Sequence, residues 1–523
     1  AYSGPTTISG GVLAFSGAGG LAAGGALALT GSGASLDASA ASGDMTFASL
    51  SGVANSFISL GGRTLTVGDA TSGVFAGAIA GSGGFVKQGA GTLTFTGSNS
   101  YTGPTTVAGG VLQVGAGGST GSIPGSVSVA GGATFAFNRS DDLTYGGTVS
   151  GGGGFTKSGA GRLTLTAANT YAGATLVSGG TLALSGAGDI AASSGVNLSS
   201  ASSVLDISAA SGSRAIAGPL TGAAGSRVVL GGNSLQATYQ FDPGVSGQFD
   251  GVISGSGGFT KFGDSALVMT SMQQFTGPAI VAAGDLILPA GTELSSASKI
   301  FVAAGAYMEN FGALTIVDSQ TLGGYGTVYG NVAFNSGAIL SPGGSVGTLS
   351  VAAGTTYWNG GMHYTFEIND AAGTPGVSPG WDLFSTTADI ALSITGTDQI
   401  VIDLASLTDA AVGPAANFNP SYNYAWKFAV AGTDIPYDYT QNPGWFRVDA
   451  TAFQAQNTVN GQFYVVRGDQ MPDLPSFSQN NLIGTSNELY MIYAAIPEPS
   501  TVVLAGIGLA VAGLAAARRR RRR

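Results

Sequence analysis

Residues 83–114 read GGFVKQGAGTLTFTGSNSYTGPTTVAGGVLQV, and this stretch decides the fold because it returns twice more along the chain. Aligning the sequence with itself, without gaps, superposes residues 81–114, 151–184 and 255–288. Twelve columns hold the same residue in all three copies, so the chain contains a true internal repeat. Numbered in the first copy, these columns are Gly81, Gly83, Gly84, Phe85, Lys87, Gly89, Leu93, Thr96, Gly103, Val107, Gly110 and Leu112.

The recurring positions fall mostly on alternate residues from Phe85 to Val107, and a period of two is the period of a strand. Leu93 and Phe95 are expected to face one side of a sheet, while the paired glycines mark corners. One such unit cannot cover its own apolar face, so neighbouring units must stack. We therefore predict an all-β fold with a β-solenoid over residues 1–355.

The composition agrees with this prediction. The chain has 523 residues, of which 89 are Gly, and only 9% are charged, a mixture that suits short strands joined by tight turns. Glycine does not recur at every third position, which excludes collagen, and 44% hydrophobic residues argue against disorder. The absence of cysteine excludes disulfides and Cys-based zinc sites.

The charge is unevenly distributed. The net charge is −10 with 18 basic and 28 acidic residues, and because the last six residues are all Arg, the remaining chain carries −16. Such an acidic body is not expected to bind nucleic acid. Acidic residues are concentrated towards the C-terminal side, since residues 301–495 hold 15 acidic and 3 basic residues.

The C-terminus has the features of a membrane stop. Residues 501–517 read TVVLAGIGLAVAGLAAA and predict a transmembrane helix of about 25 Å, long enough to cross a bilayer core. The basic tail that follows directly, residues 518–523, is expected to remain cytoplasmic, with the body of the protein on the other side of the membrane. The predicted cytoplasmic stop consists of Arg518, Arg519, Arg520, Arg521, Arg522 and Arg523.

A short motif precedes the apolar run. Pro497, Glu498 and Pro499 lie in a predicted linker at residues 491–500. The order of PEP, apolar helix and Arg cluster resembles the PEP-CTERM sorting signal of Gram-negative bacteria. This resemblance implies an exported protein that is anchored in the inner membrane until an exosortase-like enzyme processes it, and that then lies at the cell surface or outside the cell. It also implies exopolysaccharide as a partner.

The repeated stretch itself resembles the autotransporter-associated β-strand repeat, found in passengers that form right-handed parallel β-helices. Residues 341–349, SPGGSVGTL, are similar to a segment common late in such passengers. No series of ten-residue amphipathic strands follows, so we expect no translocator barrel of the autotransporter kind. Residues 1–15 form a partial copy, because Tyr2 to Ile8 align with Tyr101 to Val107. We therefore expect the natural protein to begin upstream, with a signal peptide.

Residues 356–490 differ in composition from the repeats and are predicted to form an acidic, β-rich cap on the solenoid. All four tryptophans of the chain lie in this region. Their flat rings make them candidates for stacking on a glycan, although tryptophans of a β-rich domain usually belong to its core. The four candidates are Trp358, Trp381, Trp426 and Trp445.

No residue predicts catalysis, a cofactor or a metal. The single histidine, His363, has no recognisable nucleophile, and the adjacent Asp141 and Asp142 are expected to be a solvated pair in a loop. Lysine could act as the base of a lyase, but a lysine copied in every repeat is better explained as structural. The amides in the Asn99 column are too far apart in sequence to contact one another.

We therefore predict a structural or adhesive protein of the surface or matrix and not an enzyme. Two alternatives remain at this point. One is a polysaccharide lyase or glycosidase built on the β-helix. The other is a carbohydrate-binding module in the cap.

Overall fold

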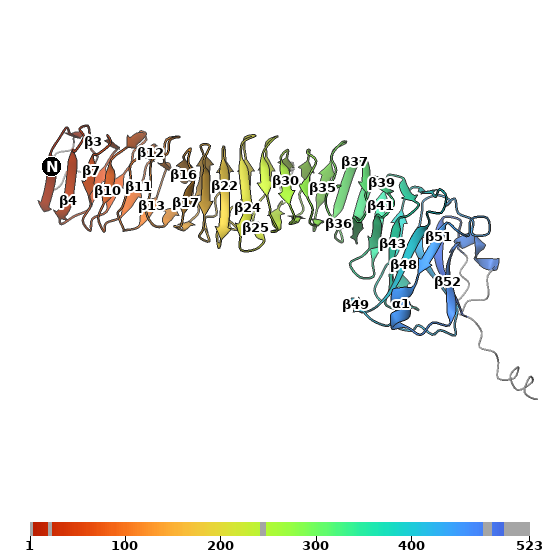
Figure 1. Ribbon diagram of the computed structural model, residues 1–523. Coiled ribbons are helices and arrows are strands. Elements are labelled where there is room, and N and C mark those ends of the chain that lie inside the picture. Colours follow the sequence, from red (N-terminus) through yellow and green to blue (C-terminus); the bar gives the residue numbers. More distant parts are fainter. Residues whose placement is uncertain (1–3, 19–23, 241–246, 474–483, 496–523) are drawn as a thin grey trace, which may run out of the picture. The chain divides into compact units, whose positions relative to one another are not determined.

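The computed structural model describes residues 4–18, 24–240, 247–473 and 484–495 (Figure 1). Contacts divide the chain into two compact units. Unit 1 comprises residues 1–300 and 306–312, and unit 2 comprises residues 301–305 and 313–523.

The predictions for the C-terminal tail lie outside the described residues. They are the PEP motif, the transmembrane helix at 501–517 and the basic residues 518–523. Within the described ranges, no helix is both long enough and apolar enough to cross a membrane.

Unit 1 is a parallel β-solenoid in which each turn of the chain, here called a rung, lies on the turn before it (Figure 1). Strand β11 (Phe85–Lys87) pairs in parallel with β8 (Leu65–Val67) on one side and with β13 (Thr105–Val107) on the other. Phe85 lies opposite Leu65 and Thr105, each twenty residues away. The predicted all-β solenoid with parallel strands is confirmed.

The strands stack in several ladders. One ladder contains six strands and another seven. The first consists of β5 (Met45–Phe47), β8, β11, β13, β15 (Val127–Val129) and β18 (Val149–Ser150). The second consists of β17 (Leu143–Tyr145), β20 (Arg162–Leu165), β22 (Thr181–Gly186), β24 (Val204–Ala210), β27 (Arg227–Val229), β30 (Val252–Gly255) and β33 (Gln274–Phe275).

The repeat copies do not lie directly above one another. In the first copy, the strand with the repeated lysine is β11, in the six-stranded ladder. Its counterpart β19 (Gly154–Ser158) pairs with β16 (Thr134–Asn138) instead, and β31 (Phe259–Phe262) pairs with β28 (Leu235–Thr238). The copies therefore recur on different ladders, with other rungs between them, as their spacing in the sequence predicted.

The interior of unit 1 is filled by the alternating apolar residues. On β12 (Thr92–Phe95), Leu93 and Phe95 are both buried, as expected. The ring of Phe95 lies 5.0 Å from that of Phe85 in an edge-to-face arrangement, and each fully buried ring of this size contributes about 1.5–3 kcal/mol. The prediction of strand period from Phe85 to Val107 needs one correction. Asn99 and Tyr101 lie in the irregular segment between β12 and β13, although both are buried.

Glycine is required where rungs turn closely over one another. Gly89 has a φ of +72°, a region that favours glycine. A Cβ atom at this position would also overlap the backbone of Asp69 in the rung before it. These two constraints explain why the column of Gly89 holds glycine in every copy.

Unit 2 begins with parallel pairing and ends with antiparallel pairing. Strands β40 (Ile339–Pro342), β43 (His363–Ile368), β48 (Ile400–Thr408) and β51 (Phe446–Asp449) pair in parallel in that order. Parallel pairing therefore continues beyond residue 355. The limit of the solenoid at this residue stays a prediction.

An antiparallel sheet completes unit 2. It is formed by β50 (Tyr424–Val430), β53 (Glu488–Ala495) and β52 (Gly461–Arg467). A single α-helix occurs in the described part of the chain, α1 (Thr451–Gln456), in the segment that joins β51 to β52.

Candidate functional site

The repeated lysines are buried inside unit 1. Lys87, Lys157 and Lys261 are each at most 1% exposed. The ammonium group of Lys87 donates to the carbonyl oxygens of Gln88 at 2.6 Å, Gly89 at 2.9 Å and Gly109 at 3.2 Å. An ammonium group has three donors, so all of them are used. Because Gly109 lies 22 residues further on, the lysine joins the corner of its own rung to the next rung.

The other two copies repeat this arrangement with small changes. Lys157 donates to Ser158, Gly159 and Gly179 at 2.9–3.1 Å. Lys261 donates to Gly263 and Ala283, both at 2.6 Å, and its Nζ lies 5.9 Å from the ring centre of Tyr239. Burial lowers the pKa of Lys157 and of Lys261 to about 8. The lysine column is thus a structural device that connects successive rungs.

The repeated amides also connect rungs. Asn99 Oδ1 accepts a hydrogen bond from the backbone N–H of Ile79 at 3.0 Å, and its Nδ2 donates to the carbonyl of Ser122 at 2.8 Å. Asn169 accepts from Val149 in the same way. These amides bond to backbone groups of the rungs before and after, and not to one another.

The third copy keeps this role with a longer side chain. Gln273 Oε1 accepts from Ile253 N–H at 2.9 Å, and its Nε2 donates to the carbonyl of Ser271 at 2.7 Å. Buried backbone groups that would otherwise lack partners are therefore satisfied at the irregular corner of each copy.

The four tryptophans lie in unit 2, and the structure narrows their candidacy for glycan stacking. Trp358, Trp381 and Trp426 are at most 4% exposed, so none of their ring faces is open to a sugar. The indole N–H groups of Trp381 and Trp426 donate to the carbonyls of Lys427 and Ala371. Only Trp445 is partly exposed, and stacking on a glycan stays a prediction for this residue alone.

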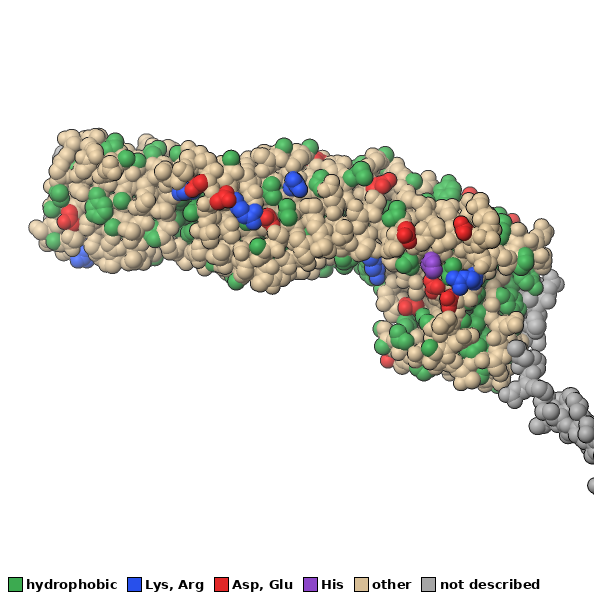
Figure 2. Space-filling view, viewed as in Figure 1, with side chains coloured by type: hydrophobic (Ala, Val, Ile, Leu, Met, Phe, Trp, Pro, Cys, Tyr) green, Lys and Arg blue, Asp and Glu red, His purple; other side chains and the backbone are tan. Residues whose placement is uncertain are grey.

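His363 lies on a partly exposed face of β43. Its Nδ1 atom is 2.7 Å from Oδ2 of Asp403 on β48, and both side chains are more than one third exposed. Figure 2 shows the histidine beside acidic and basic side chains of the same unit. No serine or threonine hydroxyl among the described residues bonds to His363, so the pair is not extended to a nucleophile.

Asp141 and Asp142 do not form a pair of catalytic carboxylates. Asp141 forms an ion pair with Arg139 at 2.6 Å, and this hydrogen-bonded guanidinium lowers the pKa of the carboxyl group. Asp142 accepts from the backbone N–H of Arg162, 20 residues further on. Both lie in the segment before β17, and their carboxylates hold different partners. In the described ranges, no three His, Asp or Glu side chains lie close enough together to hold a metal ion.

One buried acid was not predicted from the sequence. Asp382 is fully buried, and its two oxygens accept the backbone N–H groups of Gly347 and Glu367, each at 2.9 Å. Burial, together with the nearby charge of Glu367, raises the pKa of this carboxyl group well above its ordinary value. The carboxyl group joins the SPGGSVGTL segment to β43. Nothing in the sequence around Asp382 signals this role.

Comparison with known families identifies the repeats. The Passenger-associated-transport-repeat family matches residues 1–15, 85–114 and 155–184. The matched stretches at 85–114 and 155–184 include the lysine and amide columns described above. In residues 255–288, Lys261 and Gln273 make equivalent contacts. The chain carries repeats of this family, as the sequence resemblance indicated.

A curated relative is similar over part of the chain. It is the Adhesin BmaC autotransporter of Brucella suis biovar 1 (strain 1330), which is 34% identical over 139 residues. This match covers 26% of the chain, and the chain spans only 4% of the length of that relative.

The C-terminus matches a sorting signal. The PEP-CTERM protein-sorting motif covers residues 495–522, which include Pro497, Glu498 and Pro499. This motif marks a protein for membrane association and for processing by an exosortase. The chain is therefore an exported protein of a Gram-negative bacterium that is first anchored in the membrane and then reaches the surface.

Proposed function

We propose that this exported chain, with its passenger-type repeats and PEP-CTERM tail, is a structural and adhesive protein of the cell surface or extracellular matrix. The observation that carries the proposal is the use of the repeated polar side chains. The ammonium group of each lysine in the column donates its hydrogen bonds to backbone carbonyls of its own rung and of the next rung. In the described part of the chain, the lysine and amide columns that recur between copies therefore build the solenoid and are buried inside it.

The proposed absence of enzymatic activity has the same support. A lyase or glycosidase on a β-helix needs carboxylates, lysines or arginines gathered on one accessible face. In unit 1 the repeated lysines are buried, and Asp141 and Asp142 serve separate partners. The adhesin named above supports an adhesive role by its similarity. Exopolysaccharide remains a proposed partner, which the PEP-CTERM motif suggests.

Beads coated with the purified chain test this function. We expect the beads to be retained on extracellular matrix from the producing bacterium, because adhesion requires only a folded surface. Beads coated with heat-unfolded chain are the control and are expected to wash off. Equal loss of both kinds of bead, or release of new reducing sugar ends from the matrix by the soluble chain, would contradict the proposal.

A further inference from the structure

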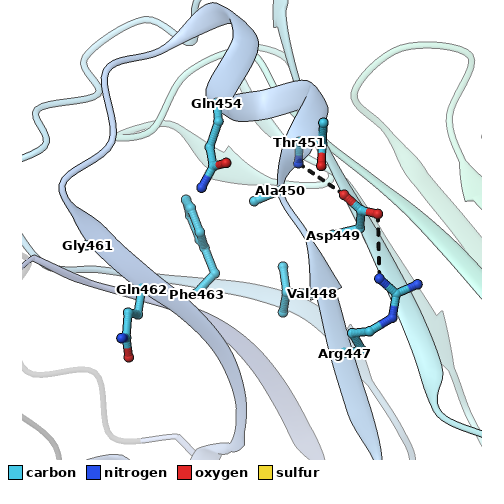
Figure 3. Close-up of a pocket in the computed structure, with 9 residues that line it drawn as sticks. All are labelled: Arg447, Val448, Asp449, Ala450, Thr451, Gln454, Gly461, Gln462 and Phe463. Atoms are coloured by element: carbon cyan, nitrogen blue, oxygen red, sulfur yellow. Dashed lines mark hydrogen bonds and ion pairs between the residues drawn. The ribbon is translucent and has the colours of Figure 1, made fainter.

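Unit 2 contains a pocket of about 500 Å³ between β51 and β52 (Figure 3). Among the described residues, each of these strands pairs on one side only, β51 with β48 and β52 with β53. The pocket therefore lies between two open strand edges. Its wall includes Arg447, Val448, Asp449, Gln454, Gln462 and Phe463.

The backbone of β51 offers hydrogen bonds to this pocket. Ile400 lies opposite Phe446, and its N–H donates to the carbonyl of Trp445. In a parallel pair the residues of an edge strand alternate between facing the partner strand and facing away. With this register, the N–H and C=O of Val448 point to the open edge. Neither group has a hydrogen-bond partner among the described residues.

The charged side chains of the pocket compensate each other. Arg447 Nη1 lies 3.6 Å from Oδ2 of Asp449, and the other oxygen of Asp449 accepts the backbone N–H of Thr451 at 3.1 Å. The pocket thus has one cation and one anion, and its net charge is zero. Residues 313–495 of unit 2 carry 14 acidic and 3 basic residues, a surplus that disfavours an anionic ligand.

Two amides and one aromatic ring complete the wall. The side chains of Gln454 and Gln462 are exposed, and neither amide has a partner among the described residues. Figure 3 shows Gln454 reaching from α1 towards the ring of Phe463. This ring lies 5.0 Å from that of Tyr493 and 5.6 Å from that of Phe453, so packing holds it in position.

We propose that this pocket binds a neutral saccharide. Sugar hydroxyls both donate and accept hydrogen bonds, which suits two amides, an ion pair and an open backbone N–H and C=O. The ring of Phe463, packed against Phe453 and Tyr493, supports this polar wall and offers the pocket little apolar surface. A peptide strand added to the edge would gain most of its affinity from main-chain bonds. Because β51 has only four residues, it offers few of them. This inference rests on the proposed adhesive function, for which it names the ligand class.

Calorimetric titration of the full chain with maltohexaose, cellohexaose and laminarihexaose tests the pocket. We expect at least one of these neutral sugars to bind. The double variant Gln454→Ala, Gln462→Ala is expected to weaken this binding about tenfold, since it removes two amides that bond directly. Gln456→Ala is the matched control, because Gln456 lies on the same helix, is also exposed and does not line the pocket. Its affinity is expected to equal that of the parent chain.

Three results would overturn the inference. They are no binding of any of the three sugars, equal binding by the double variant and the control, or binding only of oligogalacturonate or of an extended peptide. The bead experiment separates this inference from the proposed function. If the beads are retained but no sugar binds, the saccharide site is refuted and the adhesive function stands. If a sugar binds but the beads are not retained, the adhesive function is refuted and the saccharide site stands.

Discussion

The hydroxyl group of Tyr101 lies 2.8 Å from Oγ1 of Thr105, and both side chains are buried inside the solenoid. The second repeat copy preserves the pair, since Tyr171 and Thr175 are 2.6 Å apart at the same columns. A buried hydroxyl without a hydrogen-bond partner destabilises the fold. The contributions of two hydroxyls that bond to each other are therefore coupled.

The third copy changes both members of this pair together. Phe275 stands in the tyrosine column and Ala279 in the threonine column, and both are buried. Removing both hydroxyls leaves no orphaned polar group, which explains why the apolar version also fits the solenoid.

This relationship predicts strong coupling between the two positions. Tyr101→Phe leaves Thr105 without its partner, and Thr105→Ala does the same to Tyr101. Each single substitution is expected to lower the free energy of unfolding by about 1–3 kcal/mol. The double variant, which copies the third repeat, is expected to cost less than the sum of the two. Urea unfolding followed by circular dichroism measures this cycle, and strictly additive costs would show that the pair is not a unit.

The lysine column predicts how stability depends on pH. The pKa of Lys157 is about 8 in the folded chain, against an ordinary value of 10.5. Between these values the unfolded chain binds more protons, so this lysine makes stability rise with pH, by at most about 1.4 kcal/mol per pH unit. Lys157→Met lacks this contribution. The stability of the parent chain relative to the variant should therefore increase from pH 8 to pH 10.

Urea unfolding of both chains at several pH values measures this difference. Taking the difference cancels the other groups that titrate in the same range, and measurements stay below about pH 10, where tyrosines of the unfolded chain begin to ionise. Two stability curves that run parallel over this range would refute a lowered pKa for Lys157.

The parallel register predicts a distance that a different fold would not give. Thr46 and Ser128 lie in the same column of the six-stranded ladder, four strands apart. At roughly 4.8 Å between strands, their backbones are about 19 Å apart. The chain has no cysteine, so Thr46→Cys and Ser128→Cys allow two spin labels to be placed specifically. Electron-spin distance measurement should return this short distance, and a value at least twice as large would exclude the register.

Much of the solenoid could be predicted because its physics is local. Alternating residues such as Leu93 and Phe95, and glycine at a turning point such as Gly89, carry the signal within one rung. The recurrence of Lys87 in every copy likewise predicted a structural role. The corner that holds Asn99 departed from strand geometry, because its backbone is satisfied by a side chain and not by regular pairing.

The features of unit 2 depend on contacts between distant segments and were not predictable in this way. The four tryptophans could not be distinguished by their sequence surroundings. Contacts between distant segments bury three of them and leave Trp445 partly exposed. Likewise, Gln454 and Gln462 line one pocket only because the segment after β51 brings α1 and β52 to the same side of unit 2. Such residues have no local pattern that distinguishes them from ordinary surface glutamines.

The basic tail predicts how the protein is anchored. Replacing the six arginines from Arg518 to Arg523 with glutamine removes the positive flank that keeps the C-terminus in the cytoplasm. We expect the variant to be poorly retained at the inner membrane and poorly processed. Cell fractionation and immunoblotting of the precursor and processed forms measure both effects. A variant that fractionates and matures like the parent chain would contradict the proposed topology.

Attachment of living cells tests the proposed surface function most directly. A shortened chain can be made by deleting residues 81–150, which joins Ala80 to Gly151, a residue in the same repeat column as Gly81. Rungs of a solenoid contribute additively, so this chain is expected to fold and to be exported. We predict that a strain without the protein attaches poorly to its matrix, that the full chain restores attachment and that the shortened chain restores part of it. Equal attachment by the strain without the protein and its parent would contradict the adhesive role.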